Sequence, residues 1–127
     1  YSLDYIKKLL KKLSADTITS QTPTIVFARD PKCDLAEFKL DDLSCYGMFT
    51  SVNRTHAMNI FEGSQSLQGN LDPKILLEDN KVIKESVSKI ISDFADYPGF
   101  IFNLGHGITP DIDPDKVKVL VDAVREN

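Results

Sequence analysis

Short apolar runs alternate with segments of helical periodicity along the whole chain. The apolar runs are residues 24–28, 44–49, 66–70 and 100–104. The first of them is apolar from Ile25 to Ala28, which is typical of a strand covered on both faces of a sheet. The helical segments are residues 3–14, 34–40, 52–61, 81–94 and 114–126. Strands and helices in this alternating order favour an α/β fold with a parallel sheet.

The number of units limits the possible architectures. Strand-to-strand spacings here are typical of βα units, and four such units are half of an eight-stranded β/α barrel. An open four-stranded sheet is the alternative. A half barrel leaves two strand edges unpaired, which natural proteins avoid. The chain also starts at Tyr1 instead of Met, inside a helical pattern. We therefore expect a piece of a longer chain, or a partner that covers the edges.

Composition narrows the classes of function. The formal net charge is −4, and no stripe of Lys and Arg with interleaved aromatic residues is present, which argues against a nucleic-acid partner. No apolar run approaches the roughly 18 residues of a membrane span. Cys33 and Cys45 form no Cys-x-x-Cys pair and have no histidine pair nearby, so they do not indicate a metal site. Isolated thiols suit a reducing compartment. We expect a cytoplasmic protein, with a plastid-type location as the alternative.

Two glycine-containing stretches close the third and fourth apolar runs, at residues 68–73 and 103–107. They fall at the C-terminal ends of strands, where a β/α barrel keeps its chemistry. His106 lies there between Gly105 and Gly107. A histidine ordinarily titrates near neutral pH and can donate a hydrogen bond or a charge to a carboxylate. Flanking glycines let a large flat ligand approach the backbone. A purely structural hydrogen bond is the alternative role for His106.

Other polar residues have simpler interpretations. His56 lies in a weakly periodic segment and is expected on the surface. Asn70 and Asp72 are expected to cap the turn and the helix after the third strand, with a direct substrate role as the alternative. Arg29 and Asp30 follow the first strand, and we expect a local ion pair between them. The alternative for Arg29 is a contact with a substrate carboxylate.

Several stretches carry a resemblance to a known family. They are residues 67–73 (Leu-Gln-Gly-Asn-Leu-Asp-Pro), 103–107 (Asn-Leu-Gly-His-Gly), 110–114 (Pro-Asp-Ile-Asp-Pro), 121–124 (Val-Asp-Ala-Val) and the strand 25–30 (Ile-Val-Phe-Ala-Arg-Asp). Together they resemble uroporphyrinogen decarboxylases, enzymes of haem and tetrapyrrole biosynthesis. The resemblance covers residues 1–127 as the C-terminal half of such an enzyme.

The resemblance implies a (β/α)8 TIM barrel, of which this chain is roughly the last four βα units. It implies a homodimer that works without metal or cofactor. The implied reaction removes the carboxyl groups of the four acetate side chains of uroporphyrinogen III and gives coproporphyrinogen III. His106 matches a histidine of the family's substrate cleft, so its implied roles are catalysis and substrate binding. The family's other cleft residues belong to the first half, so this piece alone is expected to be inactive.

One departure leaves alternatives open. The family often carries Leu-Asp-Trp where this chain has Met48-Phe49-Thr50. An inactive or scaffold homologue, or a fragment of the same barrel, is therefore one alternative. A corrinoid-type methyltransferase is the other, since such enzymes share the barrel. They need a zinc site with thiolate ligands, and no cysteine stands at the matching places, residues 27–29 and 103–106.

Overall fold

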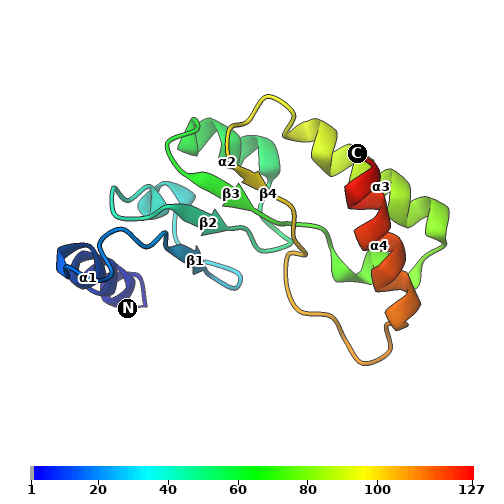
Figure 1. Ribbon diagram of the computed structural model, residues 1–127, viewed down its shortest axis with the longest axis horizontal. Helices are drawn as coiled ribbons and strands as arrows, with labels where there is room; N and C mark the ends of the chain where they lie inside the picture. The colour runs from blue at the N-terminus through cyan, green and yellow to red at the C-terminus, as the bar shows by residue number, and fades with distance from the viewer. Residues whose placement is uncertain (1) are drawn as a thin grey trace.

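A parallel four-stranded sheet forms the centre of the molecule in the computed structural model, which describes residues 2–127 (Figure 1). The strands are β1 (Ile25–Phe27), β2 (Cys45–Gly47), β3 (Ser66–Gln68) and β4 (Phe100–Ile101). Each strand pairs in parallel with the next one in the sequence, so their order in the sheet is β1-β2-β3-β4. The predicted parallel sheet is confirmed, although each strand is shorter than the apolar run that predicted it.

Helical segments connect the strands. The chain starts with α1 (Ser2–Ala15), and the later helices are the 3-10 turn η1 (Leu35–Phe38), α2 (Arg54–Phe61), the 3-10 turn η2 (Pro73–Leu77), α3 (Asn80–Asp93) and α4 (Pro114–Glu126). The predicted bounds of α4 are confirmed, because the Asp113 side chain accepts a hydrogen bond from the Asp115 N–H and caps the helix. The sequence did not predict η2, and the predicted helix 34–40 is the short 3-10 turn η1.

The strand order distinguishes between the two architectures that the sequence left open. A doubly wound open sheet reverses direction once, so that its helices cover both faces. Here every crossover adds the next strand on the same side, and right-handed crossovers of that kind place the helices on a single face of the sheet. This singly wound order is the arrangement of a β/α barrel.

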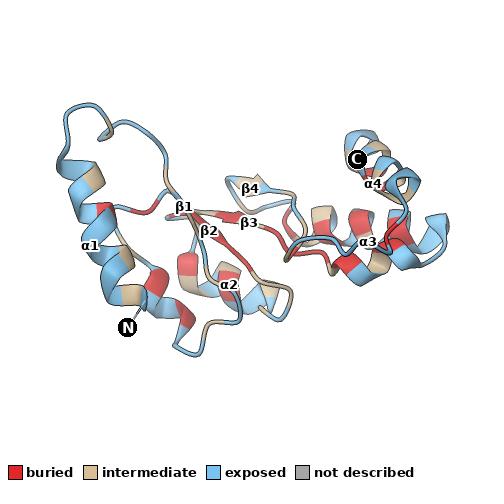
Figure 2. Cartoon of the chain, turned by 90° about the horizontal axis from the view of Figure 1, so that it is seen from below, coloured by how far each residue is buried: buried red, intermediate tan, exposed pale blue. Residues whose placement is uncertain are grey.

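The core lies between the sheet and its helices. Tyr46 of β2 and Leu67 of β3 are fully buried and are partners across the strands. The Tyr46 ring stacks on Phe61 of α2 with centroids 5.4 Å apart, and Phe100 of β4 stacks on Phe94 at 4.0 Å. Buried residues accordingly concentrate on β2, β3 and the helix sides that face them (Figure 2).

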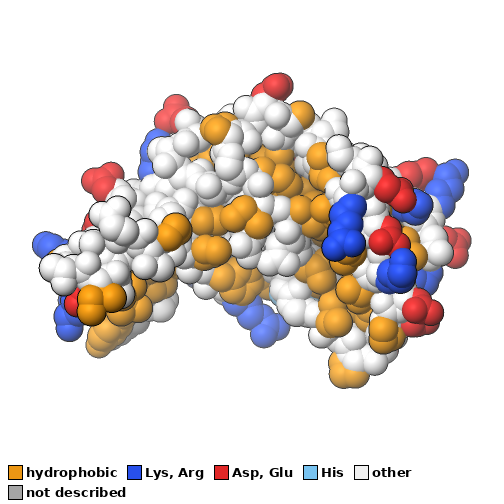
Figure 3. Space-filling model, in the orientation of Figure 1, with side chains coloured by type: hydrophobic (Ala, Val, Ile, Leu, Met, Phe, Trp, Pro, Cys, Tyr) orange, Lys and Arg blue, Asp and Glu red, His pale blue; other side chains and the backbone are white. Residues whose placement is uncertain are grey.

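The other face of the sheet is open. Its side chains Ile25 and Phe27 in β1 are 54% and 49% exposed, and Ile101 in β4 is 42% exposed. The prediction that residues 24–28 are covered on both faces is therefore wrong for the described chain, because no element within residues 2–127 covers this face of the edge strand. The space-filling view shows hydrophobic side chains gathered across the middle of the molecule, over the strands (Figure 3). In a closed barrel the inner face meets side chains from the opposite strands.

Candidate functional site

The segments that follow β2, β3 and β4 are joined by backbone hydrogen bonds beyond the strands themselves. The Met48 N–H donates to the Gln68 carbonyl oxygen at 2.7 Å, and the Gly69 N–H donates to the Ile101 oxygen at 3.0 Å. The Gly105 N–H donates to the Leu71 oxygen at 2.8 Å. Strand pairing therefore continues into the loops, which are held at the C-terminal edge of the sheet, as the sequence predicted.

His106 stands at the end of the β4 segment with its ring half-buried. Its Nδ1 atom lies 2.9 Å from the carbonyl oxygen of Gly107. Because a carbonyl oxygen only accepts, Nδ1 carries the proton of this bond. The bond ties the ring to its own neighbour and not to another element, so it orients the imidazole. Nε2 is then the ring atom left to meet a ligand.

An aromatic row crosses this edge of the sheet. The Phe49 ring, from the loop after β2, lies 5.5 Å from the His106 ring at an angle of 31°. Phe27 at the end of β1 lies 6.4 Å from Phe49. An aromatic ring is therefore present where the family's Leu-Asp-Trp pattern is replaced. The sequence did not predict the contact between Phe49 and His106, because it depends on how two distant loops pack.

The two glycines beside His106 differ in their surroundings. A Cβ atom on Gly105 would lie 2.6 Å from the backbone nitrogen of Thr50 and 2.7 Å from its Cα. Gly105 is therefore needed for the close approach of the β4 segment to the loop after β2. A Cβ atom on Gly107 would meet nothing within 4 Å. Only Gly107 leaves the open space that the sequence suggested for a ligand.

Asn70, which follows β3, has a different role from the predicted one. It is 3% exposed, and its Nδ2 donates to the carbonyl oxygens of Phe49 at 3.0 Å and Val52 at 2.8 Å. The prediction that it caps the local turn is wrong, since its partners lie in the loop after β2. The predicted capping role of Asp72 is confirmed, since it accepts from the Lys74 N–H at 2.9 Å, but the segment that it caps is η2, which was not predicted.

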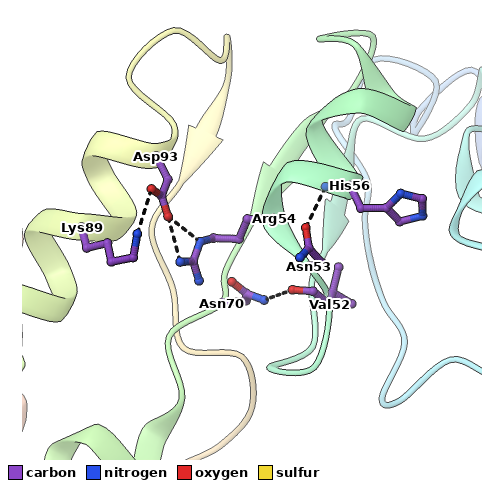
Figure 4. Close-up of polar contacts among 7 residues, drawn as sticks. All are labelled: Val52, Asn53, Arg54, His56, Asn70, Lys89 and Asp93. Carbon is purple, nitrogen blue, oxygen red and sulfur yellow. Dashed lines mark hydrogen bonds and ion pairs between the residues drawn. The ribbon is translucent and has the colours of Figure 1, made fainter.

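An ion pair supports the same region from the side of the helices (Figure 4). Arg54, the first residue of α2, donates from Nε and one Nη to the same carboxylate oxygen of Asp93, at 3.0 and 2.8 Å. Burial of the Asp93 carboxyl raises its pKa, but the hydrogen bonds and charges of Arg54 and Lys89 outweigh this effect and hold the pKa below its usual value. The pair ties the start of α2 to the end of α3.

The remaining charged candidates lie outside this cluster. Asp30 pairs with Lys32 at 2.6 Å, so the predicted pair with Arg29 is wrong; the side chain two residues ahead reaches Asp30 instead. Arg29 is exposed and lines a groove of about 630 Å³ between α1 and the loop after β1, to which His106 does not contribute. His56 is exposed on α2, as predicted, and Figure 4 shows its ring pointing away from Asn70.

Within residues 2–127, no group of three or more His, Cys, Asp and Glu side chains is placed to hold a metal ion. No helix in the described part of the chain has the length and apolarity needed to cross a membrane.

A model of the uroporphyrinogen decarboxylase family matches residues 1–127. The chain belongs to the uroporphyrinogen decarboxylase family. Among its relatives, the uroporphyrinogen decarboxylase of Alcanivorax borkumensis is 35% identical and that of Hahella chejuensis 36%, each over 99% of this chain. The enzyme of that name from Dichelobacter nodosus is 37% identical over 99% of the chain.

The family accounts for the fold. Uroporphyrinogen decarboxylases are TIM barrels, so the predicted fold class is confirmed by the match and by the singly wound parallel sheet. The chain spans about a third of the length of the relatives it matches, 36% for the A. borkumensis protein and 35% for the H. chejuensis protein. The matched family model and the relatives above carry the name of the decarboxylase, which favours the decarboxylase over the methyltransferase alternative.

Proposed function

We propose that the protein carrying this chain is a carboxy-lyase that converts uroporphyrinogen III to coproporphyrinogen III without a cofactor. The family match over residues 1–127 is the observation that carries the proposal. The site geometry supports it through His106, whose ring is oriented by its neighbour's carbonyl and lies beside the aromatic ring of Phe49. Residues 1–127 are proposed to be the last four βα units of the barrel.

The chemistry needs few groups from the protein. Each step breaks the bond between a side-chain CH2 and its carboxylate, releases CO2 and adds one proton, so that acetate becomes methyl. The electron pair of the broken bond enters the pyrrole ring once that ring is protonated, so the substrate is its own electron sink. The protein contributes position, charge complementarity and a proton.

We assign His106 a role in binding the substrate and in catalysis. Its Nε2 faces away from the bond that holds Nδ1, so Nε2 donates to a substrate carboxylate when the ring is cationic. Phe27 and Phe49 offer apolar surface for the flat macrocycle beside it. Because the chain itself has a net charge of −4, the cations that hold the other carboxylates belong mostly to the rest of the barrel.

The assembly and the location remain parts of the proposal. We propose a homodimer in the cytoplasm, as the resemblance to the family implies. The tetrapyrrole substrate is its small-molecule partner.

The test compares two histidines of the same chain in the complete gene product. His106→Asn leaves no donor atom at the position of Nε2, whereas His106→Gln keeps an amide N–H near that position. His56→Asn, on the exposed side of α2, is the matched control. We expect kcat/KM for uroporphyrinogen to fall by roughly 100-fold in His106→Asn, less in His106→Gln, and not in His56→Asn.

Chromatography of the products separates the possible outcomes. Accumulation of partly decarboxylated intermediates by His106→Asn supports a direct role in the reaction. Wild-type rates in all three variants would contradict the role of His106. No conversion by a folded wild-type protein would favour the alternative, an inactive or scaffold homologue that has lost this chemistry around Phe49.

A further inference from the structure

We propose that Asn70 is a positioning residue of the substrate site. It holds the loop after β2 so that the Phe49 ring lies against His106. The inference rests on the proposed function of His106, but its geometry belongs to the described chain alone. Asn70 itself is not a catalytic residue, because its buried amide acts through the loop.

The first observation is the pair of hydrogen bonds that the Asn70 amide donates. Asn70 is 3% exposed, and Nδ2 donates to two carbonyl oxygens of one loop, those of Phe49 and Val52. The same loop is closed by the Val52 N–H, which donates to the Phe49 oxygen at 2.9 Å. Figure 4 shows the Asn70 amide directed at Val52. An amide that bridges both ends of a turn fixes the orientation of the whole turn relative to β3.

The second observation links this turn to His106. Thr50, inside the turn, packs so closely on Gly105 that a Cβ atom there would lie 2.6 Å from the Thr50 nitrogen. Gly105 immediately precedes His106, and its N–H donates to Leu71, the residue after Asn70, at 2.8 Å. Asn70 therefore sits between the two segments that carry Phe49 and His106. A shift of the turn would therefore change the position of the Phe49 ring relative to His106.

The third observation concerns the buried acceptor atoms of Asn70 and Thr50. The Oδ1 atom of Asn70 is buried without a hydrogen-bond partner among residues 2–127, and so is Oγ1 of Thr50. A buried acceptor without a partner offsets much of what the two donated bonds contribute to stability. Among residues 2–127, the Asn70 side chain therefore acts through the two hydrogen bonds that it donates to the turn, as expected of a residue that supports a site.

The test uses Asn70→Ala in the complete gene product, with Asn53→Ala as the matched control. Asn53 also uses its amide on backbone near this loop, where it accepts from the His56 N–H at 2.9 Å and caps α2. Both variants lose an asparagine side chain, but only Asn70→Ala releases the Phe49 carbonyl. Asn70→Ser is the milder variant, because a hydroxyl keeps one short donor. Phe49→Leu removes the ring and defines the signal that the ring produces.

Two measurements are made on each variant. The first is the NMR signal of the His106 ring protons, which carries the ring-current shift of Phe49 at 5.5 Å. The second is the separation of kcat from KM for uroporphyrinogen. We expect the His106 signals of Asn70→Ala to move toward those of Phe49→Leu and kcat/KM to fall about 10-fold. Asn53→Ala should keep the wild-type His106 signals and change kcat/KM by no more than about 2-fold.

The outcomes separate this inference from the proposed function. If wild-type protein converts no uroporphyrinogen but Asn70→Ala still moves the His106 signals, Asn70 positions the loop and the proposed function is wrong. If Asn70→Ala keeps the wild-type His106 signals and matches Asn53→Ala in kcat/KM, the positioning role is overturned. Should Asn70→Ala fail to fold, Asn70→Ser decides the question: signals between those of wild type and Phe49→Leu support the role, and wild-type signals refute it.

Discussion

Replacing Gly105 by alanine tests the packing that brings the β4 segment to the loop after β2. The new Cβ atom would lie 2.6 Å from the backbone nitrogen of Thr50 and 2.7 Å from its Cα. Ordinary contacts between such atoms begin near 3.5 Å, so one backbone must move by roughly 0.8 Å. The Thr50 hydroxyl group, which is also in contact, can rotate away, but the two backbone atoms cannot. The Phe49–Val52 turn that contains Thr50 is in addition held by Asn70.

The expected loss of stability follows from these contacts. Overpacking of a well-packed site costs about 1–3 kcal/mol, and loosening one hydrogen bond of the turn adds about 1 kcal/mol. Alanine also restricts the unfolded chain more than glycine does, which offsets about 0.5 kcal/mol of this loss. We therefore expect Gly105→Ala to lower the free energy of unfolding by about 1.5–3.5 kcal/mol and to reduce turnover, because His106 is the next residue.

Gly107→Ala is the matched control, since a Cβ atom there meets nothing within 4 Å. We expect its free energy of unfolding to stay within about 0.5 kcal/mol of the wild-type value. Urea unfolding of the complete gene product, followed by circular dichroism, measures both variants. Equal stability of Gly105→Ala and Gly107→Ala would refute the close packing of Gly105 on Thr50.

Two further predictions concern stability. Arg54→Ala should lower the free energy of unfolding by about 1–2 kcal/mol at neutral pH, because it breaks the ion pair with Asp93. Because the folded-state pKa of Asp93 is lowered, the stability from this pair is present above the unfolded-state pKa near 3.9 and is lost as the pH falls through the folded-state pKa. The unfolding curves of variant and wild type should therefore converge in acid and not in base. Burial raises the pKa of Tyr46 to about 12, and its hydroxyl has no hydrogen-bond partner within residues 2–127, so Tyr46→Phe should be as stable to thermal unfolding as wild type or slightly more stable. Tyr97→Phe loses hydrogen bonds to Gln65 and Gly63 and should be less stable by about 1–2 kcal/mol.

The sequence predicts the elements of this fold well where local signals are strong. Helix α4 begins at Pro114 because Asp113 caps it, and both residues are readable signals. The turn η2 was missed because Asp72-Pro73 is equally typical of a plain turn. Burial of β1 was predicted wrongly, since an apolar run shows that a strand prefers cover but not whether the chain at hand provides it.

The candidate site was predicted less completely. The segment around His106 was identified from its glycines and from the resemblance, and the structure places it at the predicted strand end. Phe49 and Asn70 were not linked to it, because their contacts join loops that are far apart in the sequence. The pairing of Asp30 was wrong for a more local reason: flexible side chains such as Lys32 reach across two residues, and the sequence alone does not rank such partners.

The central claim is that the complete gene product decarboxylates uroporphyrinogen. The most direct measurement is incubation of the purified protein with uroporphyrinogen III in the absence of added metal and cofactor, followed by chromatography of the products over time. We expect this decarboxylation to give intermediates that have lost one to three carboxyl groups and then coproporphyrinogen III. A folded protein that leaves uroporphyrinogen unchanged over many hours would contradict it.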